Sequence, residues 1–150
     1  MRISRRRAGM GGFSLIEVMI VLVIIGILLL VAVPGYQESM RKSHRADGMR
    51  DLMELVSRQE RFYAQNSRYT GDIESADGLN FGSSISGEGH YNLSADECAD
   101  FAEDDFSTCY VLLATPRGEQ TEDACGTLSV NSKGQRDHSG SPDNDGLRCW

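Results

Sequence analysis

The longest apolar run in the chain extends from Phe13 to Val33, and its only polar residues are Ser14 and Glu17. A helix of these 21 residues is roughly 30 Å long, about the hydrocarbon thickness of a bilayer. The run therefore predicts a membrane-spanning helix. A carboxylate inside such a run costs on the order of 2.5–3.5 kcal/mol by insertion scales. Glu17 must either reach water at the interface or meet a cation, and residues 18–33 contain none.

The pattern changes after Pro34, where apolar residues recur at helical spacing. The residues that share this face are Met49, Leu52, Met53, Val56 and Tyr63. We expect one long helix over about residues 13–65, kinked near Pro34 because proline removes a helix hydrogen bond. Its first half is apolar all round and its second half is amphipathic, so only the second half should pack on its own domain.

The rest of the chain has loop and strand character. Residues 66–89 are rich in glycine and serine, a composition typical of loops. Short runs with strand character follow at residues 90–94, 108–115, 126–132 and, after a Lys133-Gly134 turn, 135–137. We expect three or four antiparallel strands that pack one apolar face on the amphipathic half of the helix. The predicted fold class is therefore α+β.

The residues before the apolar run indicate how the chain is oriented. Four arginines (positions 2, 5, 6 and 7) precede a patch of small residues that ends at Gly12. By the positive-inside rule the arginines stay in the cytoplasm and the residues after Pro34 cross the membrane. No A-x-A cleavage site follows the run, so the run would be retained. The four cysteines all lie beyond residue 97 and agree with an oxidising compartment.

The segment Gly12-Phe13-Ser14-Leu15-Ile16-Glu17, followed by the apolar run and Pro34, resembles the class III leader and N-terminal helix of type IV pilins and pseudopilins. The resemblance implies that a prepilin peptidase cuts between Gly12 and Phe13 and that the new N-terminus of Phe13 is methylated. It also implies that Glu17 neutralises the Phe13 amine of an adjacent subunit, and that the helix around Pro34 lies in the filament core.

The same resemblance implies a pilin fold and a division of the chain into three parts. These are a cleaved leader at 1–12, a transmembrane and filament-core helix at 13–35, and a globular domain at 36–150. Within that domain we expect helix at 36–65, the Gly/Ser loop at 66–89, and the sheet with a disulfide-bounded C-terminal loop at 90–150.

Four cysteines allow three pairings, and we favour Cys98–Cys109 with Cys125–Cys149. The first bridge would close off the acidic segment 100–105, and the second would tie Trp150 to the sheet. Pilins carry a C-terminal loop bounded by such a bridge, and minor pilins often end in or near Cys-Trp. A zinc site is the competing interpretation, but the cysteines are widely spaced and lack a C-x-x-C motif.

The charge of the chain bears on its partners. It has 15 basic and 22 acidic residues and a formal net charge of −7. Removal of the four leader arginines would leave 11 basic against 22 acidic residues, a net charge of −11. A nucleic-acid groove needs a basic stripe, so we predict no direct nucleic-acid partner.

One acidic segment near the C-terminus, residues 141–146, resembles half of a calcium loop. Asp143 and Asp145 could contribute oxygens, together with Asp137 from outside the segment. Calcium requires six to eight oxygens, and the alternative is a solvated turn that uses Asn, Asp and Gly for their turn geometry. We therefore predict no metal site here, with these aspartates as a weak calcium candidate, and no cofactor.

The three histidines, His44, His90 and His138, match no motif, and we expect them on the surface or hydrogen-bonded within the domain. The sequence contains no G-x-S-x-G, no H-E-x-x-H and no phosphate-cradling loop. We therefore expect no enzyme.

The resemblance favours a structural subunit of a type IV pilus, a minor pilin involved in pilus assembly and in activities such as twitching motility, adhesion or DNA uptake. Its expected partners are other pilin subunits, the prepilin peptidase/N-methyltransferase and the inner-membrane assembly machinery. It would be an inner-membrane protein with a periplasmic domain before assembly and part of an extracellular pilus afterwards. The alternatives are a pseudopilin of a type II secretion system and a membrane-tethered periplasmic binding domain.

Overall fold

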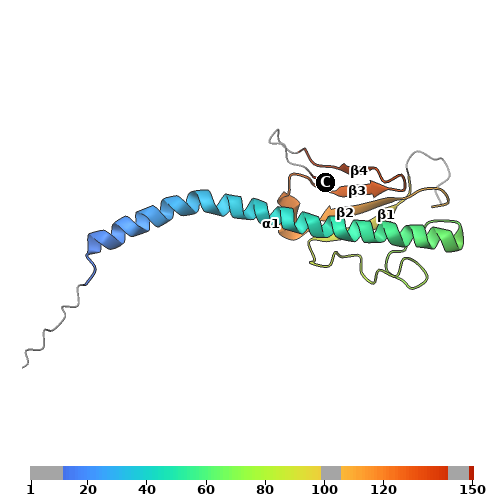
Figure 1. Ribbon diagram of the computed structural model, residues 1–150, viewed down its shortest axis with the longest axis horizontal. Helices are drawn as coiled ribbons and strands as arrows, with labels where there is room; N and C mark the ends of the chain where they lie inside the picture. Colours follow the sequence, from blue (N-terminus) through green and yellow to red (C-terminus); the bar gives the residue numbers. More distant parts are fainter. Residues whose placement is uncertain (1–11, 99–105, 142–148) are drawn as a thin grey trace, which may run out of the picture. The chain divides into compact units, whose positions relative to one another are not determined.

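The computed structural model describes residues 12–98, 106–141 and 149–150, and for Val31 the backbone alone. It consists of two compact units, Met1–Glu38 and Ser39–Trp150. Figure 1 labels the long helix α1 and the strands β1 to β4. In chain order these are α1 (Leu15–Asn66), β1 (Tyr91–Asp96), β2 (Val111–Pro116), a 3-10 helix (Gly118–Glu122), β3 (Leu128–Asn131) and β4 (Arg136–His138).

The predicted long helix is confirmed and continues through Pro34; the kink there stays a prediction. The helix begins after Ser14, whose carbonyl oxygen accepts hydrogen bonds from the backbone nitrogens of Glu17 and Val18, at 3.1 and 3.3 Å. It ends where Ser67 adopts a φ of 56° and its backbone nitrogen bonds the carbonyl of Tyr63 at 2.8 Å. Such a left-handed residue is a common helix stop, because it satisfies the last carbonyls.

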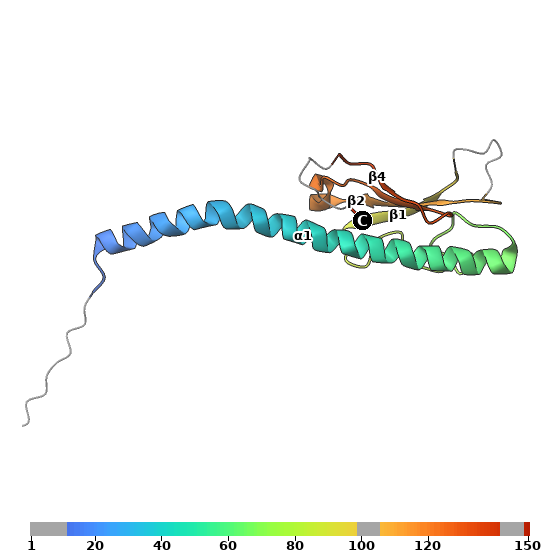
Figure 2. The same ribbon diagram turned by 45° about the horizontal axis from the view of Figure 1, so that its top comes forward.

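The four strands form one antiparallel sheet in the order β1-β2-β3-β4. In Figure 2 the sheet is a layer along one side of the C-terminal half of α1. The predicted α+β class and antiparallel sheet are therefore confirmed. The turn at Lys133-Gly134 has the predicted place: Gly134 has a φ of 74°, and its nitrogen bonds the carbonyl of Asn131 at 2.8 Å.

The core lies between this half of α1 and the sheet. Strand residues point to alternate faces, and the buried positions of β2 and β3 alternate accordingly. Leu112 lies opposite Val130 and Ala114 opposite Leu128 in the register. The buried apolar residues are Leu52, Leu55, Tyr69, Ile73, Leu79, Tyr91, Leu93, Tyr110, Leu112, Ala114, Cys125, Leu128, Val130 and Cys149.

Two details of the sequence interpretation were wrong. Tyr63, placed on the buried face of the helix, is exposed and stacks on Tyr69 with ring centroids 4.6 Å apart. The fully buried positions include Leu55 and Gln59, so the core-facing side is rotated from the predicted one. The strand expected at 108–115 starts only at Val111, because its pairing with β3 begins opposite Asn131.

The Gly/Ser-rich connection lacks strands and helices, as predicted, but it is anchored in the core. Ile73 and Leu79 are buried, and the backbone nitrogen of Leu79 bonds the carbonyl of Asp72 at 2.9 Å. Gln59 holds the start of this connection through both amide atoms, which bond the carbonyl and the nitrogen of Thr70 at 2.6 and 3.2 Å. Its path is therefore fixed by the helix beneath it.

Candidate assembly site

The N-terminal unit presents the residues that the sequence assigned to filament assembly. Phe13 lies just before α1 and is 84% exposed, and Glu17 lies in the first helical turn with its side chain exposed. A carboxylate in a first turn interacts favourably with the helix dipole. Because the Glu17 side chain is exposed, a cation on another molecule can reach it, as the assembly hypothesis requires.

The apolar surface that follows Glu17 is exposed on all sides. Large hydrophobic side chains from Leu15 to Val33 are about half or more exposed, and among the described residues this is the one helical segment long and apolar enough to cross a membrane. Burying apolar surface is worth about 25 cal/mol per Å². A helix with this surface therefore requires lipid or other apolar helices around it.

The described part of the globular unit contains two disulfides. Cys98 is joined to Cys109, and Cys125 is joined to Cys149, with Cα atoms 6.1 and 5.6 Å apart. The second bridge is buried and holds Trp150 beside the sheet. The indole nitrogen of Trp150 donates to the carbonyl of Asp137 at 2.8 Å.

Some predicted positions fall outside the described residues. The leader up to residue 11, the acidic segment 100–105 and both Asp143 and Asp145 belong to them. Asp137 lies in β4, is exposed, and accepts a hydrogen bond from the backbone nitrogen of His138 at 2.8 Å. Cleavage at Gly12 and the calcium candidate therefore stay predictions.

A buried polar cluster that the sequence interpretation missed joins α1 to the segment before β3. Arg45 donates to the carboxylate of Asp123, and Gln120 donates from its amide nitrogen to Asp123 at 3.0 Å and to the Tyr91 hydroxyl at 2.9 Å. Burial raises the pKa of Tyr91 to about 12. Burial also acts to raise the pKa of Asp123, but the hydrogen bonds from Arg45 and from the Cys125 backbone outweigh it and hold that pKa below its usual value.

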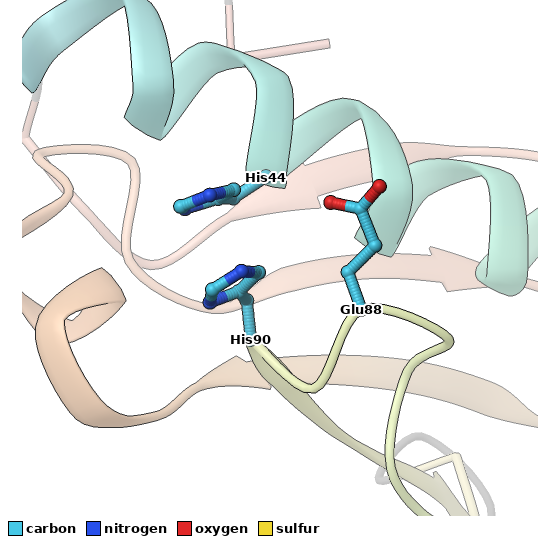
Figure 3. Close-up of side chains that lie close together, drawn as sticks. All are labelled: His44, Glu88 and His90. Atoms are coloured by element: carbon cyan, nitrogen blue, oxygen red, sulfur yellow. The ribbon is translucent and has the colours of Figure 1, made fainter.

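The structure also brings together two of the three histidines. The rings of His44, on α1, and His90, just before β1, stack with centroids 3.5 Å apart and planes 16° from parallel. Figure 3 shows the Glu88 carboxylate beside the two rings. No sequence motif links position 44 to 88–90, because the contact depends on how the connection after α1 folds back. His138 lies elsewhere and has Nδ1 3.1 Å from the carbonyl of Gly140.

Two sequence families match the chain. The profile of the family described as type IV minor pilin ComP, DNA uptake sequence receptor, matches residues 34–129, more than half of the chain. The profile of the prokaryotic N-terminal methylation motif matches residues 7–33. The two matches are contiguous and meet at Pro34.

Individual relatives match shorter stretches. The type IV major pilin protein PilA of Myxococcus xanthus is 37% identical over 70 residues, 47% of this chain and 32% of that pilin. The type II secretion system core protein G of Klebsiella michiganensis is 38% identical over 64 residues, 43% of this chain and 45% of that protein. The chain thus spans less than half the length of these curated relatives. A solved type IV pilin from Shewanella oneidensis is 24% identical, with a TM-score of 0.48 over 73% of this chain and 97% of that one.

Proposed function

Because the chain belongs to the family described as type IV minor pilin ComP, DNA uptake sequence receptor, we propose that it is a minor structural subunit of a type IV pilus. The observation that carries the proposal is the start of α1, where Phe13 just before the helix and Glu17 in its first turn lead into an exposed apolar segment inside a methylation motif. Pilins are structural subunits, and we assign no catalytic step to this chain.

The proposed mechanism uses the same helix in two surroundings. Before assembly the helix spans the inner membrane, with the leader in the cytoplasm and the globular unit in the periplasm. A prepilin peptidase/N-methyltransferase frees and methylates Phe13, and the inner-membrane machinery then moves the subunit into a filament that extends outside the cell. There the apolar surface is covered by helices of other subunits, and Glu17 meets the Phe13 amine of a neighbour, so the charge that is costly in lipid gains a partner.

Mass spectrometry of the mature protein, recovered from sheared surface filaments, tests this function. We expect an N-terminal peptide that begins at methylated Phe13. A protein that begins at Met1, or that never appears in the filament fraction, would contradict the proposal and favour a membrane-tethered binding domain.

The second candidate is a pseudopilin of a type II secretion system, which the similarity to core protein G favours. The two candidates differ in what a deletion of the gene abolishes. Loss of surface pili or of pilus-dependent motility, adhesion or DNA uptake, with protein secretion intact, supports the minor pilin. Loss of secretion with pili intact supports the pseudopilin.

The family description raises the question of DNA contact. Four arginines of the globular unit are already paired with carboxylates: Arg41 with Glu122, Arg45 with Asp123, Arg50 with Asp47, and Arg58 with Glu54. Because the chain is also acidic, we propose that it supports DNA uptake as part of the filament and does not bind DNA tightly by itself. Fluorescence anisotropy with duplex DNA at physiological salt should show a Kd no tighter than the roughly 10⁻⁴–10⁻⁶ M of non-specific binding. A nanomolar Kd would show a direct receptor.

A further inference from the structure

Three side chains with metal-binding atoms meet on one surface of the globular unit. One ligand atom each from His44, Glu88 and His90 lies within 4.8 Å of the other two. His44 and His90 are half-buried, whereas Glu88 is exposed. In Figure 3 the two imidazoles come from opposite sides, one from α1 and one from the turn before β1, with the carboxylate at their edge. The group is thus built from parts of the chain that are distant in sequence.

The turn that carries two of these side chains is held firmly against the helix. Two buried carboxylates of α1 accept hydrogen bonds from its backbone: Asp51 from Gly87 at 2.8 Å and Asp47 from Glu88 at 3.1 Å. Between Glu88 and His90 the chain turns at Gly89, whose φ of 82° is a conformation that favours glycine. The backbone positions of both potential ligands are therefore fixed before any ion arrives.

The neighbours of His44 select the tautomer of its neutral ring. The side-chain nitrogen of Gln120 donates to the carboxylate of Asp123 at 3.0 Å, which leaves the amide oxygen of Gln120 facing Nδ1 of His44 at 3.1 Å. An amide oxygen only accepts, so Nδ1 of His44 carries the hydrogen and, in the neutral ring, Nε2 carries the lone pair. A histidine that donates one ring N–H to a carbonyl oxygen and offers the other nitrogen is the usual arrangement of a metal ligand.

We propose that His44, Glu88 and His90 bind a Zn²⁺ ion, with water in the fourth position. Two imidazoles and one carboxylate suit zinc, which takes nitrogen and oxygen ligands at about 2.0–2.2 Å in a tetrahedral arrangement. Ligand atoms in such a site lie about 3.3 Å apart, so the three groups must close in from their present separations. The exposed Glu88 side chain can rotate. The two stacked rings must tilt so that their coordinating nitrogens converge on the ion, because imidazole lone pairs lie in the ring plane.

The site would clamp the turn before β1 to α1 from outside the core. This role is independent of the proposed pilus function, so a negative result in one test leaves the other standing. Thiolates do not compete for the ion, because all four cysteines are in disulfides.

Isothermal titration with Zn²⁺, and visible absorption with Co²⁺ as a spectroscopic substitute, test the proposal on the full-length chain in detergent micelles. We expect one Zn²⁺ per chain and the absorption of four-coordinate Co²⁺. We expect zinc affinity to fall at least about tenfold in each of three variants, His44→Gln, His90→Gln and Glu88→Gln. A loss of about tenfold is already usual when a residue that only supports a metal ligand is removed.

His138→Gln is the matched control, since it removes the remaining histidine of the chain and should leave both signals unchanged. Glu88→Gln changes an exposed side chain, so unchanged circular dichroism should accompany its loss of affinity and separate binding from folding. No zinc uptake by the folded wild-type chain, or an equal loss in His138→Gln, would overturn the proposal and leave the stacked histidines as a packing contact.

Discussion

Arg45 and Asp123 are 78 positions apart in the chain and form an ion pair whose side chains are only 3% and 2% exposed. The arginine comes from α1 and the aspartate follows the 3-10 helix, so the pair fastens the helix to the segment that leads into β3. A buried pair is weak evidence for net stability, because both charges lose their hydration. Removing one partner is different, because it leaves the other charge buried and alone.

Asp123→Asn should therefore destabilise the globular unit by about 3–5 kcal/mol. Urea unfolding followed by the fluorescence of Trp150, the one tryptophan in the sequence, measures the change. Glu122→Gln is the matched control: this carboxylate pairs with Arg41 but is 71% exposed, and exposed pairs contribute about 0–1 kcal/mol. Equal losses in the two variants would contradict the role given to the buried pair.

The same pair predicts a dependence of stability on pH. The folded state holds the pKa of Asp123 below its usual value, despite the opposing effect of burial, through hydrogen bonds from Arg45 and the Cys125 backbone. The stabilisation is present above the ordinary aspartate pKa of about 4 and is lost as the pH falls through the lower, folded pKa. We expect the free energy of unfolding to fall less between pH 7 and acid pH in Asp123→Asn than in the wild type, and unfolding curves at both pH values measure this difference. An unchanged acid dependence in the variant would assign it to other carboxylates.

Gly48 shows that the helix approaches the sheet closely at one point. A Cβ atom at Gly48 would lie 2.9 Å from a ring carbon of Tyr91, which is fully buried. Although alanine is favoured over glycine within helices by about 1 kcal/mol, Gly48→Ala should lower stability by about 1–3 kcal/mol through overpacking. Gly35→Ala, where the added Cβ meets nothing within 4 Å, should show the ordinary gain in helix stability. Thermal unfolding monitored by circular dichroism compares the two.

The bridge between Cys125 and Cys149 spans 24 positions, and a loop of this size stabilises by about 3 kcal/mol in the chain-entropy account. Replacing both cysteines by serine should lower stability by a similar amount. It should also release Trp150 from Asp137 and from Arg136, whose guanidinium carbon lies 5.3 Å from the centroid of the indole ring. A red shift of tryptophan emission under native conditions would report this release. Unchanged emission would show that the ring is held without the bridge.

Glu17 should matter for assembly and not for folding. Glu17→Ala removes the carboxylate proposed to meet the Phe13 amine of a neighbour, so the variant should be processed and inserted normally but nearly absent from sheared filaments. Immunoblots of membrane and filament fractions measure this ratio. Ser14→Ala, in the same exposed segment, is the control and should assemble. Wild-type levels of Glu17→Ala in filaments would refute the charge-pairing mechanism.

The sequence was informative wherever apolar residues follow a regular period. A strand was predicted within residues 126–132, and Leu128 and Val130, two positions apart in that segment, are both buried. The long helix was also predicted, from its apolar run and from the helical spacing of apolar residues after Pro34. The sequence did not predict correctly which face of the second half of the helix is buried. Gln59 lies on that face because it forms hydrogen bonds with Thr70, and not because it is hydrophobic. Buried polar groups of this kind satisfy partners that only the tertiary structure reveals.

The candidate sites divide in the same way. Phe13 and Glu17 belong to a local sequence motif, so the resemblance of that motif to type IV pilins was enough to suggest their roles. The contact of His44 with His90 depends on a turn whose backbone is hydrogen-bonded to Asp47 and Asp51. The spacing of the two histidines in the sequence does not predict this contact. A cluster assembled across 46 positions becomes visible only after the chain has folded.

The two edge strands of the sheet, β1 and β4, affect how copies of this chain behave when they are close together. An unprotected strand edge offers backbone groups to any similar edge and so invites aggregation. Here β4 is only three residues long and consists of Arg136, Asp137 and His138, while β1 is partly covered by a bridge from Ile85 to Asn92. Neither edge is a good template for sheet extension. Subunits held side by side can therefore associate through their helices without fusing irreversibly through their sheets.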